Sequence, residues 1–129
     1  MRRAPERRLM TTMEDYQLTL RKLALRDENY IEALLQTDRA NPTLSGIDDR
    51  THALIRIGAL IALDAAPAAY MDSVAKALRA GVSHEEIVGT LITVLPTVGV
   101  ARVVTAAPNL GLAIGYDVAD ALELVENGG

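Results

Sequence analysis

The sequence predicts an all-α fold, and three observations support this prediction. Apolar residues recur at helical spacing, as at Tyr16, Leu20 and Leu23, which lie at i, i+4 and i+7. Capping patterns precede several such stretches, and no hairpin turn joins two β-branched runs. Alanine, the strongest helix former, accounts for 20 of the 129 residues. We therefore expect a compact bundle of six to seven helices.

Local signals place the first two helices near the beginning of the chain. Thr11 and Glu14 have the spacing of a capping box, so the first helix is expected to open there. Asp27 is expected to cap a short second helix. Asn-Pro and Ser-Gly pairs within residues 41–46 then predict a loop.

Proline, glycine and capping residues mark the helix ends in the rest of the chain. Proline suits the first turn of a helix, glycine suits the position after the last turn, and Ser or Asp suits the N-cap. Five further helices are expected to start at Asp48 or Asp49, at Pro67, at Ser83, near Val100 and at Asp117. In the same order, they are expected to end at Leu63, at Gly81, at Pro96 or Gly99, around Pro108 and at about Val125. Pro108 is expected to kink or split its helix.

The composition excludes several classes of protein. The absence of cysteine removes disulfide scaffolds, thiolate metal sites and thiol nucleophiles. Residues 1–8 carry a net charge of +3 and the other 121 residues carry −7, so no general attraction to nucleic acid is expected. We expect a flexible basic arm over residues 1–12 and a single domain over residues 13–129. No apolar signal segment follows the arm, which predicts a cytoplasmic protein.

The second half of the chain is unusually apolar, because residues 87–101 and 103–116 contain no charge. Prolines, glycines and Arg102 interrupt these runs, so no membrane span is expected. Two nearly apolar helices are hard to cover within one small subunit, which predicts a homo-oligomer. Arg102 would be costly to bury alone, so it is expected to pair with Asp64, Asp72 or another acid, or with a ligand anion.

Two segments resemble the carboxymuconolactone decarboxylase family. Residues 49–60 read DRTHALIRIGAL, and residues 77–87 read ALRAGVSHEEI. The first is similar to the helix that opens the family core, and the second to a helix ending in glycine before a capped Glu-Glu-Ile helix. The resemblance covers residues 48–107. It implies a fold of the alkylhydroperoxidase D-like type, a trimer or hexamer, and pockets near subunit contacts.

The peroxidase branch of this family uses a glutamate, two cysteines and a histidine. The resemblance puts the cysteine positions at or near Ala66 and Ala69, the histidine at Ser73 and the glutamate at Ala53 or Leu54. None of the four chemical groups is present, so peroxidase activity is not expected. Lactone decarboxylases of the family also tend to carry a histidine near Ser73, so this chain departs from both patterns.

Five residues remain as candidates for a site. His52 and Arg56 share a helix face with Asp49, a set that could bind and protonate a carboxylate or form a solvated or interfacial ion-pair face. Tyr70 could donate a hydrogen bond to a substrate oxygen or lie at a helix surface. Ser73 lies three residues later. Arg102 is the fifth candidate.

These residues predict a cofactor-free acid/base enzyme that acts on a small carboxylate or lactone-type metabolite, with decarboxylase-like, lyase-like or isomerase-like chemistry. His52 and Tyr70 are the predicted catalytic residues, and Arg56, Ser73 and Arg102 the predicted substrate-binding residues. The alternative is a non-catalytic oligomer that binds a small molecule or acts as a scaffold.

No metal or cofactor site is predicted. The chain has no cysteine, and its two histidines lie 32 positions apart. His84 sits beside Glu85 and Glu86 in a capping sequence and is expected to face solvent. Gly111 and Gly115 form a lone small-residue spacing, which is more typical of helix packing than of phosphate binding.

Overall fold

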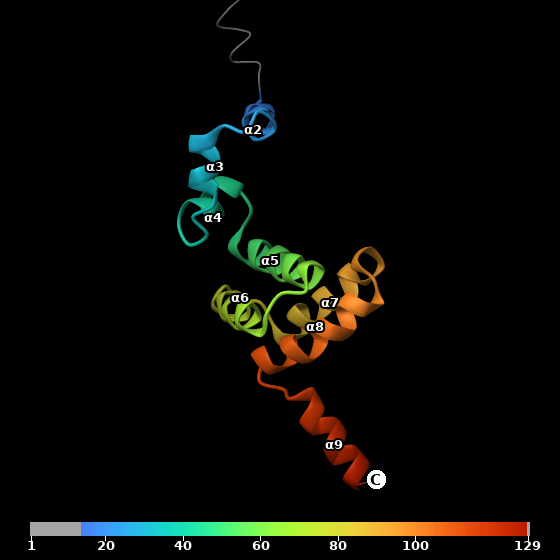
Figure 1. Cartoon of the computed structure of the whole chain (residues 1–129). Coiled ribbons are helices and arrows are strands. Elements are labelled where there is room, and N and C mark those ends of the chain that lie inside the picture. Colours follow the sequence, from blue (N-terminus) through green and yellow to red (C-terminus); the bar gives the residue numbers. More distant parts are fainter. Residues whose placement is uncertain (1–13, 129) are drawn as a thin grey trace, which may run out of the picture. The chain divides into compact units, whose positions relative to one another are not determined.

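The computed structural model describes residues 14–128, which form eight α-helices and no strand (Figure 1). The all-α prediction is therefore confirmed, with one helix more than expected. The chain divides into two compact units, one ending at Gly46 and the other beginning at Ile47. The sequence analysis does not anticipate this division, and a single domain over residues 13–129 stays a prediction. The helices, labelled as in Figure 1, are α2 (Asp15–Ala24), α3 (Glu28–Leu34), α4 (Ala40–Ser45), α5 (Asp49–Leu63), α6 (Pro67–Arg79), α7 (His84–Val98), α8 (Val100–Ala113) and α9 (Val118–Gly128).

The first two helices of the unit before Gly46 begin at capping residues. Glu14 is the N-cap of α2, and its backbone N–H donates to the Gln17 side chain at 3.0 Å. The predicted cap at Thr11 lies outside the described residues, as does the expected basic arm. Asp27 caps α3 as predicted, because its carboxylate accepts from the Tyr30 N–H at 3.2 Å.

The predicted loop over residues 41–46 is wrong, because residues 40–45 form the short helix α4. The Asn41 side chain donates to the Leu34 carbonyl at 2.7 Å, which ties the start of α4 back to the end of α3. Pro42 lies in the first turn, where its missing N–H has no helical partner to lose. Ser45 donates to the Pro42 carbonyl at 2.8 Å. Local hydrogen bonds thus convert turn-forming residues into one helical turn.

Most predicted helix ends after Ile47 are confirmed. Asp48 caps α5, Asp64 ends it, and Pro67 occupies the first turn of α6. Gly81 follows α6 with φ of 86°, a conformation that glycine adopts without strain. The capping box that Ser83 begins opens α7.

The two prolines inside the apolar helices do not break them. Pro96 lies within α7, which continues to Val98, and Pro108 lies within a continuous α8. The predictions that Pro96 interrupts its helix and that Pro108 splits its helix are therefore wrong. Both prolines are exposed, so water can satisfy the carbonyl groups that they leave without a backbone donor.

The core of the second unit lies between α5, α6, α7 and α8. Helix α5 contacts the other three, and the side chains of Val94 and Thr90 on α7 come within 3.4 and 3.7 Å of where a Cβ on Gly58 would stand. The small residue therefore brings α5 and α7 close together. The buried hydrophobic residues are Ala53, Ile57, Ile61, Tyr70, Val74, Ala77, Val82, Ile87, Ala106 and Leu110.

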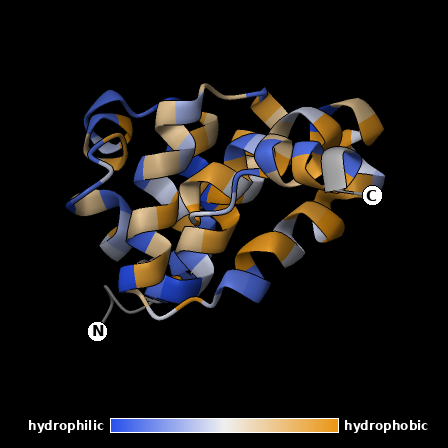
Figure 2. Ribbon diagram, turned by 90° about the horizontal axis from the view of Figure 1, so that it is seen from below, coloured by the Kyte–Doolittle hydropathy of each residue, from blue (hydrophilic) through white to orange (hydrophobic). Residues whose placement is uncertain are grey.

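Many hydrophobic residues of the second unit stay exposed. Hydrophobic segments extend along much of the helical ribbon (Figure 2), and α7 and α8 carry exposed residues such as Ile92 and Val104. No helix among residues 14–128 has the length and apolar character needed to cross a bilayer. The single subunit therefore leaves part of the apolar surface uncovered, and the homo-oligomer stays a prediction.

Candidate functional site

Arg50 joins the ends of three helices. Its guanidinium donates to the Gly81 carbonyl after α6 at 2.7 Å and to the Glu86 carboxylate on α7 at 2.6 Å. The other Glu86 oxygen accepts from the Ser83 N–H at 2.9 Å, which completes the capping box. The Ser83 N–H and the Arg50 guanidinium stabilise the charged carboxylate and hold the pKa of Glu86 below its usual range.

The sequence analysis misses Arg50, although it falls in the segment 49–60. No local pattern reveals its role, because its partners lie 31 and 36 positions away. The capping box gives part of the signal, since it fixes the Glu86 carboxylate at the start of a helix. Arg50 thus links the start of α5, the helix that carries His52 and Arg56, to the end of α6 and the start of α7.

Asp48 fixes the start of that same helix. Its carboxylate accepts from the Thr51 N–H at 2.8 Å, and this bond is the main cause that lowers the pKa of Asp48. The His52 N–H donates to the Asp48 carbonyl at 2.8 Å, the first turn of the α5 ladder. The N-cap therefore fixes where the helix that carries His52 begins.

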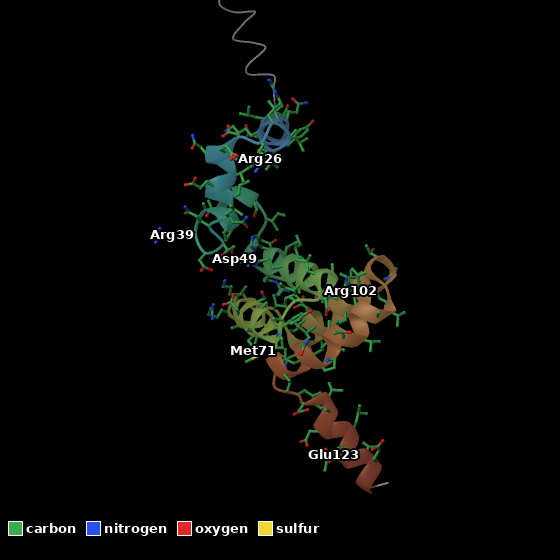
Figure 3. All side chains as sticks on the ribbon, in the orientation of Figure 1. Arg26, Arg39, Asp49, Met71, Arg102 and Glu123 are labelled. Carbon is green, nitrogen blue, oxygen red and sulfur yellow. The ribbon has the colours of Figure 1, made fainter. Side chains whose placement is uncertain are left out.

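Asp49, His52 and Arg56 lie on one side of α5, with Asp49 exposed at the start of the helix (Figure 3) and the other two half-buried. The Arg56 Nε is buried and has no hydrogen-bond partner among the described residues. A buried donor left unsatisfied costs about 1–3 kcal/mol, and such groups call for an explanation. Arg56 thus presents a donor for which the described residues supply no acceptor.

Tyr70 lies inside the core rather than at a helix surface. Its side chain is 1% exposed, and its hydroxyl donates to the Leu60 carbonyl on α5 at 3.2 Å. The alternative of a surface position is wrong, because the Tyr70 ring lies where α6 contacts α5. Burial and the charge of Asp64 raise the pKa of Tyr70, so its hydroxyl stays protonated to higher pH than a free tyrosine.

Ser73 is buried on α6, one turn after Tyr70. The positions that match the peroxidase residues of the family lie on α5 and at the start or along α6, two helices that contact each other. Ala53 is buried on α5, and Ala69 is half-buried on α6. At the positions that the resemblance assigns, the chain has alanine, serine or leucine side chains instead of a carboxylate, thiols and an imidazole.

Arg102, which is labelled in Figure 3, lies on α8 and forms an ion pair with Asp64. Its terminal nitrogen lies 3.6 Å from the Asp64 carboxylate, so the predicted pairing with Asp64 is confirmed. The Arg102 side chain is 49% exposed, so in the single subunit the guanidinium is half solvated as well as paired. Asp64 adopts φ of 54°, a left-handed conformation that is uncommon for residues other than glycine.

The structure divides the five predicted site residues between two places. Tyr70 and Arg102 both lie near Asp64, at the end of α5. His52 lies 12 residues earlier, about 18 Å away along the helix axis at 1.5 Å per residue. No single site uniting all five is therefore evident.

A shallow hollow of about 300 Å³ lies on α7, and none of the five predicted residues lines it. His84 stands at its edge, exposed as expected. Within residues 14–128, no group of three or more His, Asp or Glu residues lies close enough together to hold a metal ion. The residues that line the hollow are His84, Glu85, Val88, Gly89 and Ile92.

Comparison with protein families identifies the chain. The model of the carboxymuconolactone decarboxylase family matches residues 28–109, which is more than half of the sequence. The chain therefore belongs to the carboxymuconolactone decarboxylase family. The match begins in α3 and ends in α8, so it extends further toward the N-terminus than the resemblance over residues 48–107. Comparisons with curated proteins and with solved structures find no match.

Proposed function

We propose that this family member is a cofactor-free acid/base enzyme that acts on a small carboxylate or lactone-type metabolite. The observation that carries the proposal is the buried Arg56 Nε, which has no acceptor among the described residues. A guanidinium recognises a carboxylate through charge-assisted, often bidentate hydrogen bonds. A bound carboxylate or oxyanion would remove the cost of the unsatisfied donor.

His52 is the proposed acid/base residue. It lies one turn before Arg56 on the same half-buried side of α5, so one small ligand can reach both residues. Imidazole can both give and accept a proton near neutral pH. The arrangement puts a proton donor beside a fixed positive charge.

This pair suits the decarboxylation of a lactone acid. The bond between the ring and the leaving carboxyl group breaks, and its electron pair moves into the neighbouring unsaturated system. A proton must then be delivered to carbon, which is the role proposed for His52. Arg56 would stabilise the oxyanion that develops as the electrons move. Thiol peroxidation is not part of the proposal, because the chain has no cysteine.

Tyr70, Ser73 and Arg102 have secondary roles in the proposal. The Tyr70 hydroxyl already donates to the Leu60 carbonyl, so it can serve a substrate only if that bond exchanges. Ser73 is buried beside it on α6. Arg102 makes one long contact with Asp64 and keeps other N–H groups for an anion. The predicted trimer or hexamer and the cytoplasmic location also remain part of the proposal.

A binding titration tests the role of Arg56. The full chain is titrated in a calorimeter with an unsaturated γ-lactone carboxylic acid and with its methyl ester. We expect the acid to bind and the ester to bind at least about tenfold more weakly, because the ester lacks the charge that Arg56 recognises. Arg56→Met is expected to abolish this difference, whereas Arg79→Met, at an exposed arginine of α6, should preserve it.

The same variant separates binding from folding. Arg56→Met removes the unsatisfied donor, so its free energy of unfolding is expected to stay within about 1 kcal/mol of the wild type or to rise. Equal affinity for acid and ester, or an unchanged preference in Arg56→Met, would refute the proposed site. His52→Gln is expected to bind the lactone acid but to lose its turnover, which is measured as the release of carbon dioxide.

The alternative is a non-catalytic oligomer that binds a small molecule or acts as a scaffold. The occupied hydroxyl of Tyr70 favours this alternative, because it leaves only one proton donor beside Arg56. Binding of the acid that depends on Arg56, without turnover by the wild type, would identify a binding protein. Absence of both binding and turnover would favour a scaffold.

A further inference from the structure

We propose that the outer side of α7 binds the same side of a second copy of this chain, with the two helices antiparallel. We call this surface the Gly89 face, made of Glu85, Val88, Gly89, Ile92 and Pro96. The first observation is the hollow of about 300 Å³ on α7, to which all these residues except Pro96 contribute. The hollow is shallow and open, and all the residues that line it belong to α7.

Gly89 leaves the hollow open. A Cβ placed on this residue would meet nothing within 4 Å, so no other described part of the chain covers it. The fold of the subunit therefore does not require glycine at this position in mid-helix, where glycine is less stable than alanine. A second helix that approaches closely would explain why this position is a glycine.

Ile92 provides a projecting side chain next to the hollow. It is 71% exposed, and Val88, one turn earlier, is 41% exposed. The opposite side of α7 is fixed in the core by Ile87, which is fully buried. Burial of an apolar side chain favours association, and each copy would bury one isoleucine.

The projecting residue and the hollow are self-complementary. Gly89 and Ile92 lie three residues apart, about 4.5 Å along the helix axis. A two-fold axis that passes between them places the Ile92 side chain of each copy in the Gly89 hollow of the other. Such an isologous contact needs only one surface that carries both features, and the Gly89 face is such a surface. This property identifies a second copy, rather than an unrelated protein, as the partner.

The charges on α7 select the antiparallel orientation. His84, Glu85 and Glu86 lie at its start, and residues 87–98 carry no charge. In the antiparallel arrangement Glu85 of one copy lies opposite the uncharged Pro96 of the other. A parallel arrangement would bring the acidic ends of both helices together, which is unfavourable.

A cysteine pair tests this arrangement directly, because the natural chain has no cysteine. Two differently tagged copies, one with Gly89→Cys and one with Ile92→Cys, are coexpressed and oxidised mildly. We expect a disulfide between the unlike copies, identified on a non-reducing gel and by mass spectrometry, because the two positions face each other across the two-fold axis. The matched control pairs Gly89→Cys with Leu124→Cys, at an exposed position on α9, and is expected to form no such disulfide.

Analytical ultracentrifugation provides the second measurement. We expect the wild type to be an oligomer at micromolar concentration, and Ile92→Asp to weaken association at least about tenfold while keeping its helical circular dichroism. Leu124→Asp is the matched control, at a similarly exposed apolar residue. A monomeric wild type, or a disulfide yield for the Gly89–Ile92 pair no higher than for the control pair, would overturn the proposal.

Discussion

The helices before Gly46 and those after Ile47 begin with the same kinds of local signal, but only the second group forms a core. Asp27 caps α3 in the same way that Asp48 caps α5, through a carboxylate that accepts from the backbone N–H three residues later. Helices α2, α3 and α4 contain no buried residue, whereas α5 to α8 supply nearly all of the buried hydrophobic side chains. A good cap therefore determines where a helix begins and not whether it is buried.

Helix length adds to this difference. The first three described helices have 10, 7 and 6 residues, and α5 has 15. Isolated helices shorter than about 12–15 residues are marginal in water, so packing must supply most of their stability. In the second unit α5 gains this support from α6, α7 and α8. The comparison predicts that equal substitutions have very different effects in the two regions.

The largest effect is expected for Ile57→Ala in the core. Ile57 is fully buried on α5, so the variant should lose about 2–5 kcal/mol of the free energy of unfolding, measured by urea denaturation. Ile55→Ala is the matched control on the same helix, because Ile55 is 53% exposed, and its loss should be below about 1 kcal/mol. Similar losses in both variants would mean that exposure in the single subunit does not reflect burial in solution.

Gly111→Ala is expected to have the next largest effect. A Cβ at this position would lie 2.8 Å from the backbone oxygen of Tyr116, too close for any contact without a shift of the chain. We expect a loss of about 1–3 kcal/mol in thermal or urea unfolding. Leu112→Ala, at the exposed neighbouring residue, is the control and should change stability less. An unaffected Gly111→Ala variant would show that the turn after α8 adapts easily.

A smaller, pH-dependent effect is expected at the Arg50–Glu86 pair. The folded pKa of Glu86 lies below its ordinary value, so the unfolded chain takes up this proton first as the pH falls. The hydrogen bond from the Ser83 N–H and the pairing with Arg50 therefore stabilise the fold above the ordinary pKa of Glu86, and this contribution is lost as the pH falls through the lowered folded pKa. We expect Glu86→Gln to have a lower melting temperature than the wild type at neutral pH. Between about pH 5 and pH 3 its melting temperature should also fall less than that of the wild type.

Glu85→Gln is the control for this pH dependence. It removes the same charge from the same turn of α7 but leaves the carboxylate that binds Arg50 in place. Its melting temperature should keep the wild-type dependence on pH. If Glu86→Gln and Glu85→Gln behave alike across this range, the ion pair with Arg50 makes no specific contribution.

The smallest effect is expected for Leu20→Ala in α2. Leu20 is 60% exposed, and alanine keeps the helix propensity, so the change should be within about 0.5 kcal/mol in urea denaturation. A loss of 2 kcal/mol or more would mean that a surface outside the described contacts buries the apolar side of α2. The comparison between the two regions would then describe the single subunit and not its state in solution.

Sequence reasoning predicts the helices better than the site. Capping residues and glycines place the ends of α5 and α6 correctly, because these signals act within a few residues. Pro96 and Pro108 mislead it, because a proline in an exposed part of a long helix can be tolerated. The loop expected at residues 41–46 is a short helix. Asn41 donates to the Leu34 carbonyl, a contact that depends on where α3 ends, and Ser45 donates to the Pro42 carbonyl within the helix.

The candidate site shows the same limit. The shared face of His52 and Arg56 follows from helical periodicity, and the structure keeps both half-buried. Of the two alternatives for Tyr70, the position at a helix surface is wrong, because the residue is buried and its hydroxyl donates to the Leu60 carbonyl on α5. Arg50 could not be singled out, because both of its partners come from distant parts of the chain.

The sequence alone determined the helical class, most helix ends and the absence of any thiol chemistry. These properties depend on residue type and on spacing within one or two turns, which the linear order of residues states directly. Only the tertiary structure decided that Tyr70 is internal, that Arg102 pairs with Asp64 while half exposed, and that the Arg56 Nε has no acceptor. These outcomes depend on which helices meet and at what angle, a result of packing the whole chain rather than of any local segment.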